Sequence, residues 1–262
     1  MVPLTAGNTR VKEARKLHRR SERSERRCFL ADGPKAVEGA LATVLGSGQD
    51  CVVEVFATPA AATEYADLLG AAPVTLVDDR AMSGLSDSVN PAGLVAVCRF
   101  LDGGLPPAPR LLTICADVRD PGNAGTVIRT SDAAGAEGVV LAGDAVDAYN
   151  PKTVRASVGS LFHLPVVLER DPAAAVRRAQ RSGLTVLAAD GAGEVDLFAA
   201  DELLTRPTAW LFGNEAWGLP DELAALADHR VRIPILGAAE SLNLATAAAV
   251  CLYASARAMM RA

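Results

Sequence analysis

The chain has 262 residues, of which 50% are hydrophobic and 22% are charged, so it can bury a core large enough for one large domain or two ordinary ones. It contains no apolar run of about 18 residues and no secretory leader pattern, so neither a membrane span nor export is expected, and the cytoplasm is the expected location. Five single cysteines and three distant histidines argue against a disulfide framework, a metal site and a Ser-His-Asp triad.

The net charge of −5 is unevenly distributed along the chain. Between Arg10 and Arg27, nine Lys or Arg stand against three Glu, and the rest of the chain is acidic. A single helix through this segment would present a cationic face of the kind that binds nucleic-acid phosphates. The candidate RNA-binding residues are Lys12, Lys16, Arg19, Arg20 and Arg23. A solvated helix face with Glu–Arg pairs is the alternative.

The first block of the chain alternates between strand and helix periodicity, which predicts a small α/β domain over residues 1–101. Strands are predicted at residues 28–33, 51–58, 73–78 and 93–101, and helices at residues 34–46, 59–70 and 79–85. The stretch "DGGLPPAPR", residues 102–110, is dense in Gly and Pro and has no apolar period. It is interpreted as an interdomain linker.

The second block, residues 111–262, predicts a larger α/β domain with a mostly parallel sheet. Its strands are expected at residues 111–118, 138–143, 164–168, 184–190, 208–213 and 229–235. Its helices are expected near residues 123–135, 150–160 and 172–183, after Pro220, and at 242–259.

Three loops of the second block each follow an apolar strand and carry small and polar residues. They span residues 117–129, 212–218 and 233–243. Ligands of open α/β sheets sit at the carboxyl ends of the strands, so these loops can enclose one pocket. A dinucleotide fingerprint and a phosphate loop are both missing, and "ADGAG" at residues 189–193 does not open a helix. Gly213 would let the chain bend tightly and bring backbone groups close to a ligand, with apolar walls from Ile233 and Leu242. Such a site would suit a planar ring such as adenine.

The sequences "NAGTVIRT" (Asn123–Thr130), "FGNEAWGL" (Phe212–Leu219) and "IPILGAAESLNLATAAA" (Ile233–Ala249) form a set. In order and spacing they resemble the three motifs of the SpoU/TrmH branch of the SPOUT RNA methyltransferases, and "NPKTVRASVGSLFHLPV" extends the resemblance. The N-terminal "KLHRR" and "FLADGPKAVEGAL" are similar to the ribosomal-protein-like substrate-binding domain of several members. The resemblance implies a trefoil-knotted C-terminal methyltransferase domain, S-adenosylmethionine as cofactor, a homodimer with composite sites, and methylation of a ribose 2'-hydroxyl.

The resemblance also implies roles for individual residues. The positions that match the catalytic motifs are Asn123, Arg129, Glu215, Ser241 and Asn243. The positions that match the cofactor contacts are Leu211, Gly213, Ile233, Ser241 and Leu242. The family's proposed base is the residue matching Arg129, although a guanidinium normally stays protonated. Arg129 could instead bind a phosphate while Glu215 or a water accepts the proton. Ala216 stands where the second motif usually has a glycine.

Structured RNA is the expected substrate, with ribosomal RNA preferred and transfer RNA as the competitor. No metal is required for the reaction. Two other functions remain open. A non-catalytic RNA-binding protein would bind RNA without binding S-adenosylmethionine, and an oxidoreductase would need a degenerate dinucleotide site.

Overall fold

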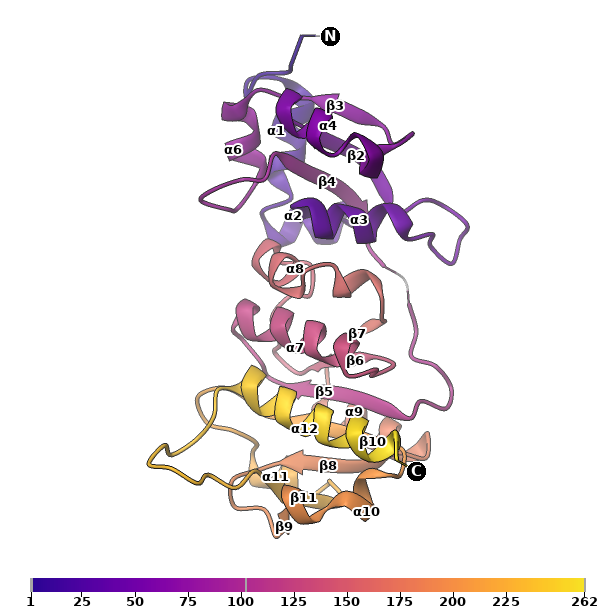
Figure 1. Ribbon diagram of the computed structural model, residues 1–262, viewed down its shortest axis with the longest axis vertical. Helices are drawn as coiled ribbons and strands as arrows, with labels where there is room; N and C mark the ends of the chain where they lie inside the picture. Colours follow the sequence, from indigo (N-terminus) through magenta and orange to yellow (C-terminus); the bar gives the residue numbers. More distant parts are fainter. Residues whose placement is uncertain (1, 102, 262) are drawn as a thin grey trace. The chain divides into compact units, whose positions relative to one another are not determined.

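The computed structural model describes residues 2–101 and 103–261, and within them the chain forms two compact units (Figure 1). The first unit holds the described part of residues 1–102 together with Asp147–His163, and the second holds residues 103–146 and those from Leu164 onward. Residues 103–110 of the predicted linker form no helix or strand and belong to the second unit. Asp102 is the first residue of the predicted linker, and it lies outside the described residues. So do residues 1 and 262, which are the outer ends of the two predicted domains.

The first unit is built on a four-stranded sheet in the order β1-β4-β2-β3. The strands are β1 (Cys28–Asp32), β2 (Val52–Ala57), β3 (Val74–Leu76) and β4 (Leu94–Arg99), as predicted. Strand β4 runs antiparallel to β1 and β2, while β2 and β3 are parallel. The connecting helices are α3 (Pro34–Ala42), α4 (Pro59–Glu64), α5 (Ala66–Leu69) and α6 (Asp79–Leu85), so the predicted helix at 59–70 is interrupted at Tyr65.

The basic N-terminal segment forms two helices, α1 (Thr9–Lys16) and α2 (Arg20–Arg26), and the prediction of one continuous helix is wrong. The guanidinium of Arg23 donates hydrogen bonds of 2.8 Å to the carbonyls of Leu17 and of His18. These bonds satisfy carbonyl groups that the end of α1 leaves without helical partners. Arg23 is therefore only 2% exposed, so it does not belong to the exposed cationic face that the sequence predicted.

Residues 147–163, which the sequence assigned to the second domain, pack with the first unit. They contain α8 (Pro151–Ser157) and the short 3-10 helix η1 (Ser160–Phe162). At the start of the segment the Asp147 carboxylate pairs with Arg23 at 2.7 Å, and Tyr149 stacks on Phe100 with ring centroids 4.0 Å apart.

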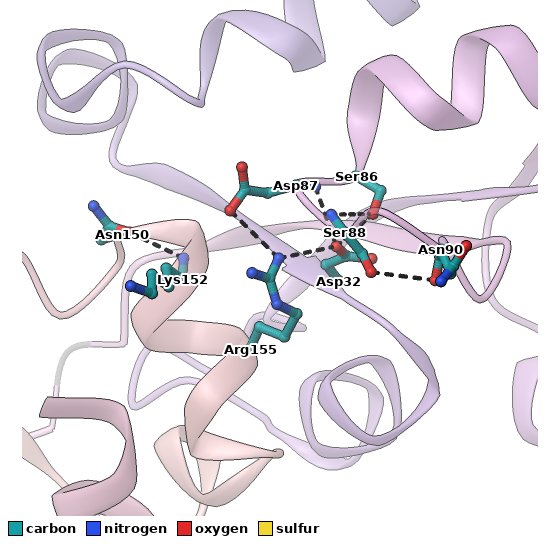
Figure 2. A network of polar contacts seen from close by, with 8 residues as sticks. All are labelled: Asp32, Ser86, Asp87, Ser88, Asn90, Asn150, Lys152 and Arg155. Carbon is teal, nitrogen blue, oxygen red and sulfur yellow. Dashed lines mark hydrogen bonds and ion pairs between the residues drawn. The ribbon is translucent and has the colours of Figure 1, made fainter. Parts of the chain in front are cut away.

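Arg155 supplies a third anchor for this segment. Figure 2 shows its guanidinium reaching from α8 toward two carboxylates, at 3.3 Å from Asp87 and 3.9 Å from Asp32. Asp32 in turn accepts a hydrogen bond from the Ser86 hydroxyl at 2.6 Å. Charged groups at the start and in the middle of the segment thus have their partners in the first unit, which explains why the segment packs there.

The second unit contains a seven-stranded sheet in the order β7-β6-β5-β10-β8-β11-β9, and every recorded pairing is parallel. The strands are β5 (Leu111–Ala116), β6 (Val139–Ala142), β7 (Val166–Glu169), β8 (Thr185–Ala189), β9 (Val195–Asp196), β10 (Thr208–Phe212) and β11 (His229–Arg232). Only the two-residue β9 was not predicted. The α/β fold class is thereby confirmed, and the trefoil knot stays a prediction.

Helices cover both faces of this sheet, as a parallel sheet requires. Helices α7 (Pro121–Ala133) and α12 (Leu244–Met259) lie beside each other on one face (Figure 1). The buried Thr113 hydroxyl bonds to Ser131 of α7, and the Trp210 indole donates to Ser255 of α12 at 2.9 Å. Helices α9 (Pro172–Arg181) and α11 (Asp221–Ala224) cover the other face of the sheet. They pack on the strand side chains that alternate in sequence with those facing α7 and α12.

Two short helices, η2 (Leu197–Ala199) and α10 (Asp201–Leu204), complete the second unit and were not predicted. Among the helices that the structure describes, none combines the length and the apolar character needed to cross a bilayer.

Candidate active site

A cavity of about 340 Å³ opens at the carboxyl ends of β8, β10 and β11 in the second unit. This is the edge where parallel sheets bind ligands. The lining residues come from the segments that follow these three strands and from the start of α12: Ala189, Asp190, Gly191, Phe212, Gly213, Asn214, Glu215, Ala216, Gly218, Val231, Ile233, Ile235, Ser241, Leu242, Leu244 and Ala247. Two of the three predicted loops therefore line one cavity, and the first loop joins them through hydrogen bonds.

Of the residues predicted to hold a cofactor, Gly213, Ile233, Ser241 and Leu242 line the cavity. Leu211 is not among its described lining residues, because its side chain is fully buried in the core on the sheet face that α9 covers.

Gly213 is required by the shape of the loop after β10. A Cβ atom at this position would lie 2.5 Å from the backbone nitrogen of Leu219 and still closer to the carbonyl group of Gly218. The loop closes on itself because Asn214 and Gly218 exchange backbone hydrogen bonds of 3.0 and 2.9 Å. The tight bend predicted at Gly213 is therefore present, and the backbone that this glycine approaches most closely is that of its own loop.

Glu215, Asn123 and Asn243, which lie far apart in the sequence, form one hydrogen-bonded cluster. The Glu215 carboxylate accepts a hydrogen bond of 3.2 Å from the side-chain amide of Asn123. It also accepts the backbone N–H groups of Arg119 at 3.2 Å and of Asp120 at 3.1 Å. The side-chain amide of Asn243 donates to the Asn123 oxygen at 3.0 Å.

The cluster is held by the starts of two helices. Asp120 caps α7, where its carboxylate accepts the Asn123 N–H at 2.7 Å and Pro121 occupies the first turn. Asn243 caps α12 and accepts the Ala245 N–H at 2.9 Å. The Glu215 carboxylate thus lies against the backbone N–H groups that lead into α7, where the partial positive charge of a helix amino end attracts anionic groups.

The structure does not bring Arg129 into this cluster. Its side chain is exposed and leaves α7 about 120° around the helix axis from Asn123. Within the described residues it has no hydrogen-bond or ion-pair partner, and it does not line the cavity.

Ala216 fits its position without strain. It lines the cavity, and its N–H donates to the side-chain oxygen of Asn214 at 2.8 Å. Its backbone does not adopt the positive φ that would favour glycine. The alanine in this motif therefore leaves the loop geometry intact.

Sequence reasoning missed several parts of the site. The wall formed by residues 189–191 was considered only as a failed dinucleotide fingerprint. The Asn214 amide donates to the Asp117 carbonyl at 2.6 Å and so joins two of the loops. The backbone donors to Glu215 were also missed, although the Asp120–Pro121 pair is a signature of a helix start that could have indicated them.

In the first unit, the predicted RNA-binding residues Lys12, Arg19 and Arg20 are exposed. Lys16 is partly neutralised by an ion pair of 2.7 Å with Glu13. Hydrogen bonds from Lys16 and Arg26 lower the pKa of Glu13 below its ordinary value. No cluster of three or more His, Cys, Asp or Glu side chains suited to a metal occurs in the described part of the chain.

Comparison with known proteins places this site in a family. Residues 110–253 match the family model of the SpoU rRNA Methylase family, and residues 8–96 match that of the MRM3-like substrate binding domain. The 23S rRNA (guanosine(2553)-2'-O)-methyltransferase RlmP of Bacillus subtilis (strain 168) is 34% identical over 252 residues, which cover 95% of this chain and 96% of the relative.

Solved structures agree with this match. An rRNA methyltransferase from Sinorhizobium meliloti, crystallised with bound AdoMet, superposes with a TM-score of 0.81 at 31% identity, covering 98% of this chain and 97% of the other. The SpoU methyltransferase AviRb from Streptomyces viridochromogenes gives a TM-score of 0.83 at 29% identity, covering 97% and 98%. The resemblance inferred from the sequence motifs is confirmed, and the chain belongs to the SpoU rRNA Methylase family.

Proposed function

We propose that this protein transfers the methyl group of S-adenosylmethionine to the 2'-hydroxyl of a ribose in ribosomal RNA. It is an RNA 2'-O-ribose methyltransferase by its family and by relatives that match over nearly its whole length. The observation that carries the proposal is the juxtaposition of two features at one sheet edge. A cavity of about 340 Å³ has the Glu215–Asn123–Asn243 cluster at its border.

The cavity fits S-adenosylmethionine in size and in chemistry. Its volume falls in the usual range of ligand sites, about 300–1,000 Å³. Ile233, Leu242 and Leu244 provide apolar walls for an adenine ring. Gly191 and Gly218 line the cavity, and both have open space where a Cβ would stand. The Glu215 carboxylate supplies negative charge that favours a cationic ligand, whereas that of Asp190 is paired with Arg230 at 2.5 Å.

When bound, S-adenosylmethionine supplies an electrophilic methyl group on a sulfonium centre. The protein must then align the ribose oxygen with that methyl group and assist the loss of the hydroxyl proton. Glu215 is poorly placed to be the base, because three donors already occupy its carboxylate oxygens. We assign it the role of ordering the loop after β10, and Asn123 and Asn243 the role of orienting the ribose.

We assign Arg129 to the substrate phosphate and to the negative charge that develops on the ribose oxygen. A guanidinium, which normally stays protonated, is suited to this electrostatic role. Its exposed position on α7, away from Asn123, supports its action in the site of a partner subunit. The homodimer with composite sites, which the motifs imply, is therefore part of this proposal, as is the trefoil knot around the cofactor.

We propose that the first unit binds the RNA. Its match to a substrate binding domain and the exposed Lys12, Arg19 and Arg20 support this role. Contacts with phosphates would make binding fall steeply with salt. Ribosomal RNA is preferred over transfer RNA because two relatives that match the chain over nearly its full length, RlmP and the Sinorhizobium meliloti enzyme, are named as rRNA methyltransferases.

The proposal is tested by incubating the purified protein with S-adenosylmethionine carrying a tritiated methyl group and with protein-free 23S rRNA, 16S rRNA or tRNA. Tritium should enter ribosomal RNA, and ribose-methylation mapping should locate one 2'-O-methyl nucleotide. Calorimetry should show cofactor binding. RNA binding without cofactor binding would instead identify a non-catalytic RNA-binding protein.

A further inference from the structure

Trp217 has no evident role in the stability of the fold. Its side chain is 56% exposed, whereas the other tryptophan, Trp210, is fully buried and bonded to Ser255. A tryptophan ring is a large apolar surface that folding normally covers for the most part. Trp217 stands between Ala216 and Gly218, which both line the cavity of the proposed active site. The exposed indole is therefore next to that site.

The turn that carries Trp217 is rigidly built. Asn214 and Gly218 close it with two backbone hydrogen bonds of 3.0 and 2.9 Å. The Asn214 side chain bonds to the Ala216 N–H at 2.8 Å and to the Asp117 carbonyl at 2.6 Å. The indole is thus presented from an ordered turn, so little conformational entropy would be lost when a ligand packs on it.

Arg119 connects Trp217 to the hydrogen-bonded cluster. Its guanidinium lies over the indole, 5.3 Å from the ring centroid, and pairs with Asp144 at 2.9 Å. Its backbone N–H is one of the donors to Glu215. An arginine and a tryptophan side by side, one cationic and planar and the other aromatic, form the combination that holds single-stranded nucleic acid through stacking and charge.

We propose that Trp217 is a stacking platform for a nucleobase of the RNA substrate, at or next to the nucleotide whose ribose is methylated. This inference rests on the proposed function. Stacking accepts any base, so Trp217 contributes to RNA affinity. Arg119, held over the ring by Asp144, supports the indole and adds positive charge near the RNA backbone. Trp217 is therefore a substrate-binding residue and takes no part in proton transfer.

Tryptophan fluorescence tests the contact directly. Trp217→Phe leaves the buried Trp210 as the only tryptophan, so the difference in tryptophan emission between the two proteins reports on Trp217. Adding protein-free 23S rRNA should quench the emission of the wild-type protein and leave that of Trp217→Phe almost unchanged. Equal responses of the two proteins would overturn the inference. Trp217 emission that changes on protein dilution but does not respond to RNA would also overturn it, because a second protein subunit, and not a base, would then cover the indole.

Kinetics provide the second test. Trp217→Ala should raise KM for 23S rRNA roughly 5- to 100-fold, the range expected for one lost base stack. It should leave kcat and the Kd for S-adenosylmethionine nearly unchanged. Trp217→Phe should restore most of the affinity, because phenylalanine also stacks. The matched control is Phe198→Ala, which removes another exposed aromatic ring, 62% exposed, outside the cavity lining. An unchanged KM in Trp217→Ala, or equal losses in all three variants, would refute the inference.

Failure of this inference and failure of the proposed function look different. If only the inference is wrong, the wild-type protein still methylates 23S rRNA and the Trp217 variants match it. If the proposed function is wrong, the wild-type protein itself transfers no methyl group to RNA.

Discussion

Replacing Asp147 by asparagine should destabilise the first unit strongly. One Asp147 carboxylate oxygen accepts two hydrogen bonds from Arg23, at 2.7 and 3.0 Å, and the Arg23 side chain is only 2% exposed. The oxygen of the new amide could keep the bond that the other carboxylate oxygen accepts from the Tyr149 N–H. The NH₂ group of the amide, however, would face the Arg23 donors, and a buried guanidinium would lose its counter-charge. Breaking a buried ion pair from one side costs about 3–5 kcal/mol.

This loss can be measured by urea unfolding. With a denaturant dependence of about 2 kcal/mol per M, the midpoint of the first unit should fall by roughly 2 M. Far-UV circular dichroism follows the whole chain, whereas Trp210 and Trp217 both belong to the second unit. In Asp147→Asn, the urea midpoint seen by tryptophan fluorescence should therefore fall much less than the midpoint of the first unit seen by circular dichroism.

The matched control is Glu38→Gln in the first unit. Glu38 pairs with Lys35 at 2.7 Å, the same distance as in the Arg23–Asp147 pair, but its side chain is 53% exposed. An exposed pair contributes about 0–1 kcal/mol, so this variant should unfold almost like the wild type. If Asp147→Asn and Glu38→Gln shift the midpoint equally, burial does not make the Arg23–Asp147 pair important, and the reasoning is refuted.

Three further predictions concern the second unit. Gly213→Ala should weaken S-adenosylmethionine binding in calorimetry, because the new methyl group forces the turn at Gly218 apart; unchanged affinity would contradict that packing. Arg129→Ala should abolish tritium transfer while cofactor affinity stays nearly intact, and equal loss of both would make Arg129 a cofactor-binding residue. Burial, with a smaller contribution from the charge of Glu215, raises the pKa of Cys115 to about 12. Its thiol should therefore stay unmodified by iodoacetamide at pH 8 in the folded protein, and rapid labelling seen by mass spectrometry would contradict this.

Sequence patterns predicted the structure correctly wherever neighbouring residues determine it. The alternation of apolar residues predicted the strands on both sides of the site, and the order of the motifs indicated that Asn123, Glu215 and Asn243 belong together. Their hydrogen bonds confirm that they meet. These residues were predictable because each follows a strand or caps a helix, and the carboxyl ends of parallel strands share one edge.

The errors arise where a distant residue decides the local structure. The composition between Lys12 and Arg27 predicts one helix, but the helix is broken between α1 and α2. The Arg23 side chain of α2 turns inward and bonds the carbonyls of Leu17 and His18 at this break. The position of Arg23 depends on Asp147, which is 124 residues away in the sequence. Similarly, no periodicity could show that Gly213 faces the backbone of Gly218.

The assignment of Asp147–His163 to the first unit has a practical meaning for protein engineering. The family model of the methylase spans residues 110–253 without interruption, although the chain leaves the second unit after Val146 and returns at Leu164. A chimera that exchanges the N-terminal region at one junction near residue 102 would separate Arg23 from Asp147 and Phe100 from Tyr149. Grafting a new substrate-binding module onto this catalytic scaffold therefore requires transplanting two stretches of sequence together.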